Sequence, residues 1–262
     1  MQPRSILITG ASSGIGRALA LVYARQGISL SLIGRDPERL EDAAAAARAR
    51  GAEVSLGQLD VRDQDGMAQW IEAADTRRPF DLVIANAGIT TGLAPGDLAE
   101  DPRAVRAIIG INLIGVLNTV EPLITPMCAR GSGQIAFIGS IAGVRGLPYA
   151  PSYCATKAAV HVYSESLRGR IEARGVRVSL IIPGFVKTPL NDSIDAMKPL
   201  EITGTDAAVL IQRGLERGRA IIAFPRSLYL AARLARILPA RLVDKVMARF
   251  QVKVPETQER NP

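Results

Sequence analysis

The sequence predicts an α/β fold built around a parallel β-sheet. Short apolar runs of strand length alternate along the chain with longer segments of helical periodicity. A glycine-rich turn joins the first of these strands to the first helix, and polar residues follow several later strands. Alternation of this kind is typical of βαβ units, in which the strands lie parallel and helices cover the sheet.

The first unit consists of a strand, a turn and a helix. Residues 6–8 are apolar, residues 17–24 repeat apolar side chains at helical spacing, and the turn at residues 9–16 reads Gly-x-x-x-Gly-x-Gly. Such a turn lets backbone amides and a helix N-terminus approach a pyrophosphate, because no Cβ blocks the way. The spacing departs from the common Gly-x-Gly-x-x-Gly pattern, so a tight turn without a ligand is the alternative.

The end of the second expected strand, residues 28–33, bears on the choice of cofactor. In dinucleotide-binding folds an acid at this position binds the 2′-hydroxyl of NAD, whereas an arginine binds the 2′-phosphate of NADP. Arg35 stands here, and Asp36 is a plausible N-cap for a helix that begins at Pro37. Arg35, together with Arg39, favours NADP(H). A solvated arginine is the alternative, and NAD(H) stays open.

The alternation continues, and polar residues mark the ends of the later strands. Asp60 follows the third strand, Asn86 the fourth, and Ser140 ends the fifth. Because ligands bind outside the carboxyl ends of strands in such sheets, we expect these side chains to face one site. The expected strands beyond the second are residues 53–59, 80–85, 134–140 and 177–182, and the expected helices are residues 38–50, 64–77, 101–127 and the segment around 153–157.

Three residues within the expected helices could carry chemistry. Asn112 lies among apolar neighbours, where its amide must be hydrogen-bonded, so it is either a structural strut or part of a polar site. Tyr153 and Lys157, four residues apart, share a helix face and can act on one atom. An ammonium near a phenol favours the phenolate and lowers its pKa from about 10. The pair can therefore pass a proton, although this spacing also occurs on ordinary exposed helices.

These features together resemble the short-chain dehydrogenase/reductase family over roughly residues 5 to 225. The resemblance depends on the order of several motifs, since no single one is specific. The matching residues are Thr9, Gly10 and Gly16, Asp60-Val61, Asn86-Ala87-Gly88, Asn112, Ser140, Tyr153 with Lys157, and Pro183-Gly184 with Thr188.

The resemblance implies a Rossmann-type, doubly wound sheet of seven parallel strands, with residues 220–224 as the seventh. It also implies hydride transfer between NADP(H) or NAD(H) and a carbonyl or alcohol carbon. Tyr153 would protonate the carbonyl oxygen during reduction, and Ser140 would orient that oxygen. Lys157 would bind the nicotinamide ribose and lower the pKa of the tyrosine, while Asn112 would support a water that links the lysine to solvent.

The resemblance further implies how the cofactor is held. Asp60 and Val61 would meet the adenine, residues 86–88 would line the adenosine side, and Thr188 would meet the nicotinamide carboxamide. The expected cofactor-binding residues are Gly10, Ser12, Ser13, Gly14, Ile15, Gly16, Arg35, Arg39, Asp60, Val61, Asn86, Ala87, Gly88, Tyr153, Lys157, Pro183, Gly184, Val186 and Thr188.

Composition and charge narrow the class of protein. The chain has 262 residues and 48% hydrophobic content, enough for one full core. Its net charge of +7 is concentrated from Arg219 onward, where nine basic residues face three acidic ones, so we expect no nucleic-acid partner. Cys128 and Cys154 form no disulfide framework, and we see neither a signal peptide nor a membrane-spanning segment. A cytoplasmic location is expected.

Other catalytic chemistries fit the sequence less well. His161 is the only histidine, and without His or Cys companions it cannot build a zinc site, so we interpret it as an ordinary helix residue and expect no metal. Cys154 lacks the base that a nucleophilic thiol needs. Ser12 and Ser13 lie in a glycine-rich turn that is not followed by the Gly-Lys-Ser/Thr of a Walker motif.

The expected organisation is an NAD(P)-binding catalytic domain at residues 1–225, a basic amphipathic helical extension at residues 226–254 and a polar tail at residues 255–262. The extension holds two expected helices, residues 227–238 and 241–250, each with an apolar side and an arginine-rich side. Such helices can lie on a membrane surface. We favour a lid or a subunit contact over peripheral membrane contact at the cytoplasmic face, which stays open.

The substrate is expected to be a small carbonyl compound or alcohol. In the family, the pocket is built by the segments that follow three strands, here residues 90–100, 141–149 and 185–201. These segments are rich in apolar residues and hold few charges, which favours an apolar or lipid-like substrate. A homodimer or homotetramer is expected. The alternative function is a non-catalytic Rossmann nucleotide-binding or regulatory protein, which the intact set of polar residues makes less attractive.

Overall fold

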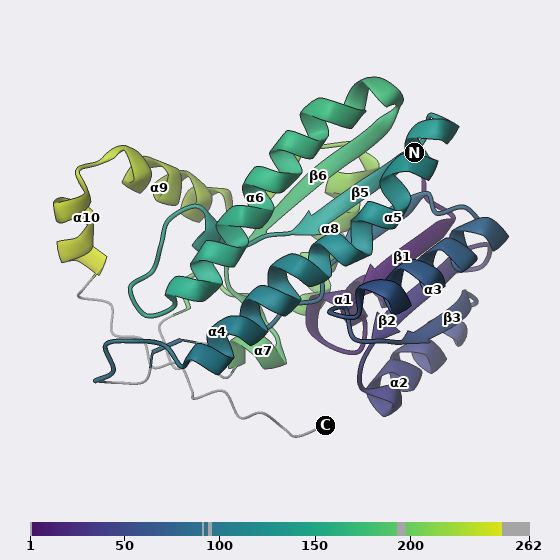
Figure 1. The fold of residues 1–262 in the computed structure, drawn as a ribbon, viewed down its shortest axis with the longest axis horizontal. Coiled ribbons are helices and arrows are strands. Elements are labelled where there is room, and N and C mark those ends of the chain that lie inside the picture. Colours follow the sequence, from purple (N-terminus) through teal and green to yellow (C-terminus); the bar gives the residue numbers. More distant parts are fainter. Residues whose placement is uncertain (1, 91, 94–95, 193–197, 248–262) are drawn as a thin grey trace.

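A seven-stranded parallel sheet forms the centre of the computed structural model, which describes residues 2–90, 92–93, 96–192 and 198–247 (Figure 1). The strand order is β3-β2-β1-β4-β5-β6-β9. The chain builds outward from β1 on one side and from β4 on the other, so the predicted doubly wound sheet is confirmed. The strands are β1 (Ser5–Thr9), β2 (Ser29–Gly34), β3 (Glu53–Gln58), β4 (Leu82–Ala85), β5 (Gly133–Ile138), β6 (Val176–Pro183) and β9 (Ile221–Phe224).

Helices cover both faces of the sheet and form two apolar layers. One layer holds α1, α2 and α8, and the other holds α3, α5 and α6. Strand β1 shows why its three central residues are all apolar: Ile6 and Ile8 pack into the first layer, while Leu7 packs into the second. The helices are α1 (Gly14–Tyr23), α2 (Pro37–Arg48), α3 (Gln64–Arg77), α4 (Pro102–Ile109), α5 (Gly115–Arg130), α6 (Pro151–Ile171), α7 (Pro189–Asp192), α8 (Gly204–Glu216), α9 (Arg226–Ile237) and α10 (Ala240–Met247).

The long helix expected at residues 101–127 is interrupted. A π-helical turn, η1 (Gly110–Ile114), separates α4 from α5, and the Gly115 amide bonds the Gly110 carbonyl across it. Asn112 lies within this turn, and its side chain bonds the backbone of Ile89. Insertions of this kind are frequent at functional sites.

The helical run at residues 102–130 is long and apolar enough to cross a membrane by length and composition. Half of its most apolar window is buried inside the fold, where α5 packs on α3. Within the described residues it is the one helix that meets these criteria, and core helices pass the same test. The run is therefore a core element of the α/β domain.

Several elements were not predicted from the sequence. A small second sheet pairs β7 (Val186–Lys187) with β8 (Ile202–Thr203), and α8 follows it and packs on α1. Short 3-10 turns, η2 (Ile141–Gly143) and η3 (Glu172–Arg174), follow β5 and α6. The two helices of the extension are present as α9 and α10, but residues 248–254 and the predicted tail lie outside the described residues.

Candidate active site

Tyr153 and Ser140 meet at the carboxyl edge of the sheet, as the sequence predicts. Helix α6 carries Tyr153, and Ser140 lies two residues beyond the end of β5. Burial raises the pKa of Tyr153, and a hydrogen bond from the Ser140 side chain acts in the opposite direction. The Ser140 hydroxyl oxygen also accepts a bond from the amide of Ala142 at 3.1 Å, which begins the turn η2. The serine is thus fixed on both sides.

Lys157 lies on the same face of α6 and is almost fully buried, with 4% of its surface exposed. Its Nζ donates to the carbonyl of Ile138 at 2.9 Å and lies 5.8 Å from the ring centroid of Tyr153. Burial lowers the pKa of Lys157 to about 8. Burial, not the lysine charge, dominates the pKa of Tyr153 here. The expected lowering of that pKa by Lys157 stays a prediction.

Asn112 acts as a strut between two segments of the site. It is fully buried, its Oδ1 accepts from the amide of Ile89 at 2.8 Å, and its Nδ2 donates to the Ile89 carbonyl at 2.9 Å. A longer bond of 3.4 Å reaches the hydroxyl of Thr156, next to Lys157. A Cβ on Gly88 would lie 3.3 Å from Asn112 Oδ1 and 3.6 Å from Lys157 Nζ, so the loop after β4 passes close to both. A role in holding water stays a prediction.

The glycine-rich turn is clamped against the end of β4. Asn86 donates its side-chain amide to the carbonyls of Thr9 at 2.9 Å and Gly10 at 3.2 Å. A Cβ on Gly16 would collide with the Gly10 carbonyl. At the start of α1, Ser13 makes no side-chain cap, so the first amides of the helix have no side-chain acceptor. Such a helix start fits a pyrophosphate.

The segment after β6 closes the same region. A Cβ on Gly14 would lie 3.4 Å from the methyl of Thr188, so the predicted nicotinamide contact borders the turn. Thr188 and Val186 are buried, and Gly184 bonds the Phe224 carbonyl of β9 at 2.8 Å. The turn and this segment therefore lie side by side at the carboxyl edge of the sheet.

Arginines and acids share the corner predicted to bind adenosine. Arg35, whose side chain is 57% exposed, lies 3.6 Å from a carboxylate oxygen of Asp60, and Arg62 contacts the same carboxylate at 2.6 Å. Burial acts to raise the pKa of Asp60, but bonds and charge from Arg62, with the charge of Arg35, outweigh it and lower that pKa. Asp36 caps α2 through the amide of Arg39 at 3.0 Å, as predicted.

The sequence analysis missed other polar residues that shape the site. Asn118 holds the carbonyl of Val61 at 2.9 Å. Glu100 accepts bonds from the amide and hydroxyl of Ser152 at 2.9 and 2.8 Å, and so caps the start of α6 next to Tyr153. A polar residue within an apolar helix could have revealed Asn118, whereas Glu100 carried no local signal.

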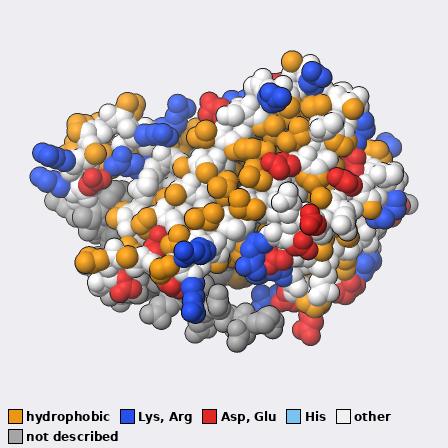
Figure 2. All heavy atoms as spheres, viewed as in Figure 1, with side chains coloured by type: hydrophobic (Ala, Val, Ile, Leu, Met, Phe, Trp, Pro, Cys, Tyr) orange, Lys and Arg blue, Asp and Glu red, His pale blue; other side chains and the backbone are white. Residues whose placement is uncertain are grey.

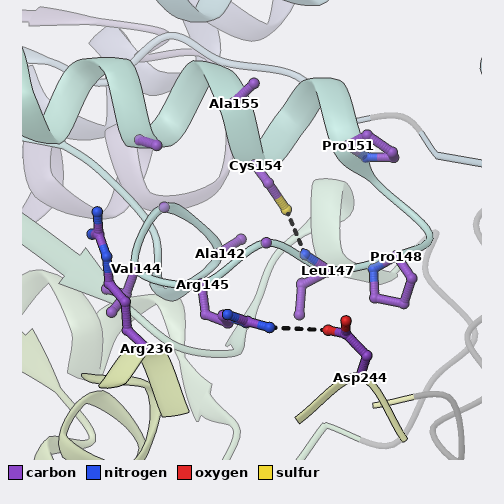
Figure 3. Close-up of a pocket in the computed structure, with 13 residues that line it drawn as sticks. Ala142, Val144, Arg145, Leu147, Pro148, Pro151, Cys154, Ala155, Arg236 and Asp244 are labelled. Atoms are coloured by element: carbon purple, nitrogen blue, oxygen red, sulfur yellow. Dashed lines mark hydrogen bonds and ion pairs between the residues drawn. The ribbon is translucent and has the colours of Figure 1, made fainter. Parts of the chain in front are cut away.

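A cavity of about 880 Å³ lies between the segment after Ser140, the start of α6 and the C-terminal helices (Figure 3). Figure 3 shows Arg145 reaching Asp244 of α10, with 3.0 Å between Nη2 and Oδ1. Cys154 turns its sulfur to the amide of Leu147 at 3.3 Å. The predicted pocket segment 141–149 thus borders the cavity. Residues 91, 94–95 and 193–197 of the other two segments lie outside the described residues.

Comparison with known proteins identifies the family. A family model described as short chain dehydrogenase matches residues 4–199. The chain belongs to the short-chain dehydrogenase/reductase family. An uncharacterized oxidoreductase of Myxococcus xanthus (strain DK1622) is 36% identical to this family member over 252 residues, which cover 96% of this chain and 99% of the relative. The chain is accordingly an oxidoreductase of the short-chain dehydrogenase/reductase family.

Three further proteins are similar to this chain in sequence or in structure. A cis-4-hydroxycyclohexanecarboxylate dehydrogenase of Sinomonas cyclohexanicum is 36% identical over 207 residues, covering 78% of this chain and 80% of the relative. A short-chain dehydrogenase from Sphingobium yanoikuyae, solved in complex with NADPH, has a TM-score of 0.78 and 26% identity, with 98% of both chains covered. A short-chain dehydrogenase/reductase from Burkholderia phymatum, solved in complex with NAD, has a TM-score of 0.80 and 24% identity, with 99% of this chain and 98% of that chain covered. At this level of identity the likeness shows the fold alone.

Proposed function

We propose that this protein is an NADP(H)-dependent oxidoreductase that interconverts an apolar carbonyl compound and its secondary alcohol. The observation that carries the proposal is the hydrogen bond between Ser140 and Tyr153, with buried Lys157 on the same helix face. This arrangement lies at the carboxyl edge of the sheet, beside a helix start whose amides lack a side-chain cap. A proton donor and a pyrophosphate-binding turn thus share one edge.

The chemistry of the residues fits reduction. When bound, the nicotinamide supplies a hydride to the carbonyl carbon in reduction and accepts one in oxidation. Tyr153 gives its phenolic proton to the oxygen, and Ser140 orients that oxygen. Burial raises the pKa of Tyr153 and so keeps the phenol protonated, ready to act as an acid. Oxidation needs the opposite state, which the charges of Lys157 and the nicotinamide ring would favour.

Tyr153→Phe tests the proposal. It removes the proton donor with little change of shape, and should lower kcat at least 10²-fold, as is typical for a lost general acid. Tyr163→Phe is the matched control, because Tyr163 lies on the same helix and its ring meets Phe137 edge to face. A carbonyl panel with NADPH supplies the substrate. Near-normal turnover by the Tyr153 variant would reject the assignment.

The preference for NADP(H) rests on Arg35, with Arg39 beside it. Arg35 is mostly exposed, and its 3.6 Å contact with Asp60 is long, so the guanidinium is accessible to a 2′-phosphate. Arg35→Ala should raise the Kd for NADPH roughly tenfold or more, the size of a lost charged contact, with little effect on NADH. Arg48→Ala, at the other end of α2, is the control. Equal weakening of both cofactors would leave NAD(H) as the better choice.

The substrate class rests on the apolar character of the segment that follows Ser140, including Val144, Leu147 and Pro148. These residues line a cavity beside the site, and neither Tyr153 nor Ser140 is part of its lining. The hydroxycyclohexane substrate named for one relative agrees with a carbocyclic or lipid-like ketone. A panel of cyclic, long-chain and small polar carbonyls, run with NADPH and NADH, should show turnover of the apolar members. Turnover confined to polar sugars would contradict this class. Absence of any turnover would favour the alternative, a non-catalytic nucleotide-binding protein.

A homodimer or homotetramer is supported by an apolar face. Figure 2 shows hydrophobic side chains gathered over α5 and α6. Val162 of α6 and Ile114 of the turn η1, which precedes α5, are exposed. Light scattering after size exclusion should give at least twice the chain mass, and Val162→Glu should reduce it. A monomer at all concentrations would remove this part of the proposal.

The C-terminal helices are proposed to act as a lid, supported by the Arg145–Asp244 contact across the cavity. Peripheral membrane contact is the competing role, since Leu230 and Leu234 on α9 are exposed beside arginines. Deletion of residues 226–262 should change the KM for substrate if they form a lid. Flotation of the full chain with anionic vesicles, lost on this deletion, would instead favour the membrane role. A cytoplasmic location is part of the proposal, in keeping with two free cysteines.

A further inference from the structure

Two side chains of α6 bind the backbone where β5 ends. The Gly139 amide still bonds β6, through the Ile181 carbonyl at 2.8 Å. On either side of Gly139, the Ile138 carbonyl accepts from Lys157 at 2.9 Å, and the Ser140 amide donates to His161 Nε2 at 3.4 Å. Lys157 and His161 are one helical turn apart, so they share a face. The helix that carries the tyrosine therefore also holds the peptide of the serine.

The imidazole of His161 fits closely between the end of β5 and η2. A Cβ on Gly139 would lie 2.5 Å from His161 Nε2, and a Cβ on Gly143 would lie 2.8 Å from His161 Cε1. Real Cβ contacts essentially never come so close, so glycine at both positions is what admits the ring. The ring lies against the segment from Ser140 to Gly143, which includes the turn η2.

The bond requires a neutral histidine, because only an unprotonated Nε2 can accept. Burial lowers the pKa of His161 to about 4, and the charges of Lys157 on α6 and Arg236 on α9 add to that effect. The imidazole therefore stays an acceptor at neutral pH.

We propose that His161 is a positioning residue for Ser140. By holding the Ser140 amide, it fixes the peptide from which the hydroxyl reaches Tyr153, while the Ala142 amide fixes the hydroxyl oxygen from the other side. This rests on the proposed function, in which Ser140 orients the carbonyl oxygen. Misplacement of such a group by about 1 Å can lower the rate roughly 10²-fold, so the effect belongs in kcat.

The test compares two replacements of the histidine in the full-length enzyme. His161→Leu keeps bulk but removes the acceptor, and should lower kcat roughly ten- to hundredfold with less than about a threefold change in the KM for NADPH. His161→Gln, whose side-chain oxygen can accept from the Ser140 amide, should restore most of kcat. Glu165→Ala, an exposed change on the same helix, is the control and should behave as wild type. Thermal unfolding of each variant shows whether it is folded.

A double-mutant cycle with Ser140→Ala decides whether His161 acts through the serine. If it does, His161→Leu should have almost no further effect in the Ser140→Ala background. Multiplicative losses, equal losses in the Leu and Gln variants, or normal kcat in His161→Leu would each overturn the proposal. Failure of the proposed function is seen separately, because Tyr153→Phe or Ser140→Ala would then keep full activity whatever His161 does.

Discussion

Replacing Lys157 by methionine should make the protein more stable at neutral pH. The ammonium is buried, and its pKa falls from 10.5 to about 8. At about 1.4 kcal/mol per pH unit, this corresponds to a penalty of about 3 kcal/mol for keeping the charge inside the fold. Methionine has similar length and no charge, but loses the bond to Ile138, worth about 1 kcal/mol. The free energy of unfolding should therefore rise by about 2 kcal/mol at pH 7.

The gain should depend on pH in a defined direction. Because the pKa of Lys157 is lower in the folded state, the unfolded chain holds a proton that the folded protein has lost between about pH 8 and 10.5. The stability of the wild type therefore rises with pH across this window, and that contribution is lost as the pH falls through 8. The variant lacks it. The stability advantage of Lys157→Met over wild type should therefore disappear as the pH rises. Near pH 10.5 the free energy of unfolding of the variant should be about 1 kcal/mol below that of wild type.

Urea unfolding without cofactor, followed by the fluorescence of the lone Trp70, measures both effects at a series of pH values. Lys187→Met, in an exposed position, is the control and should show no pH-dependent gain. The same Lys157 variant should bind NADPH more weakly and turn over more slowly, since stability and activity place opposite demands on this lysine. A Lys157→Met protein less stable than wild type at pH 7, with a gap independent of pH, would refute the reasoning.

Three further changes test other parts of the fold. Glu100→Gln replaces the carboxylate that binds Ser152 at the start of α6, and should lower the free energy of unfolding by about 1 to 2 kcal/mol in urea titrations; unchanged stability would argue against its role as a cap. Asp75→Ala leaves the Arg130 guanidinium without its partner in a site where Asp75 is 7% exposed, and should lower stability by about 2 to 4 kcal/mol; a loss below about 1 kcal/mol would mean that solvent compensates the arginine. Gly16→Ala places a Cβ against the backbone of the glycine-rich turn, and should raise the Kd for NADPH roughly tenfold or more by calorimetry; an unaltered Kd would show that the turn can shift freely.

The sheet could be predicted because its signals are local. Buried parallel strands need apolar residues on both faces, so they appear in the sequence as short apolar runs, and all seven strands lie within two residues of the expected positions. Topology then places Asp60, Asn86 and Ser140 at one edge. The shared position of Tyr153 and Lys157 on one helix could be predicted in the same way, because residues four apart lie on one face of a helix.

The contacts that complete the site could not be predicted, because they join distant segments. Arg145 and Asp244 are 99 residues apart, and Glu100 caps a helix 52 residues further along. His161 was interpreted as an ordinary helix residue, since its partner is a backbone amide that sequence patterns do not show. The pKa of Tyr153 depends on the burial of its ring, which composition alone does not reveal.

The π-turn at η1 also limits how this chain can vary in length. Each residue of an α-helix advances the azimuth by about 100°, and a π-turn holds one residue more than the α-helical turn it replaces. Loss of a single residue from 110–114 would therefore let the turn close as an ordinary α-helical turn, and α4 and α5 would keep the faces that they now present to the core. The loss would instead displace Asn112 from the backbone of Ile89, to which it is bonded from within the turn. A one-residue deletion here should therefore damage the site more than the core, although the sequence looks like a uniform apolar helix.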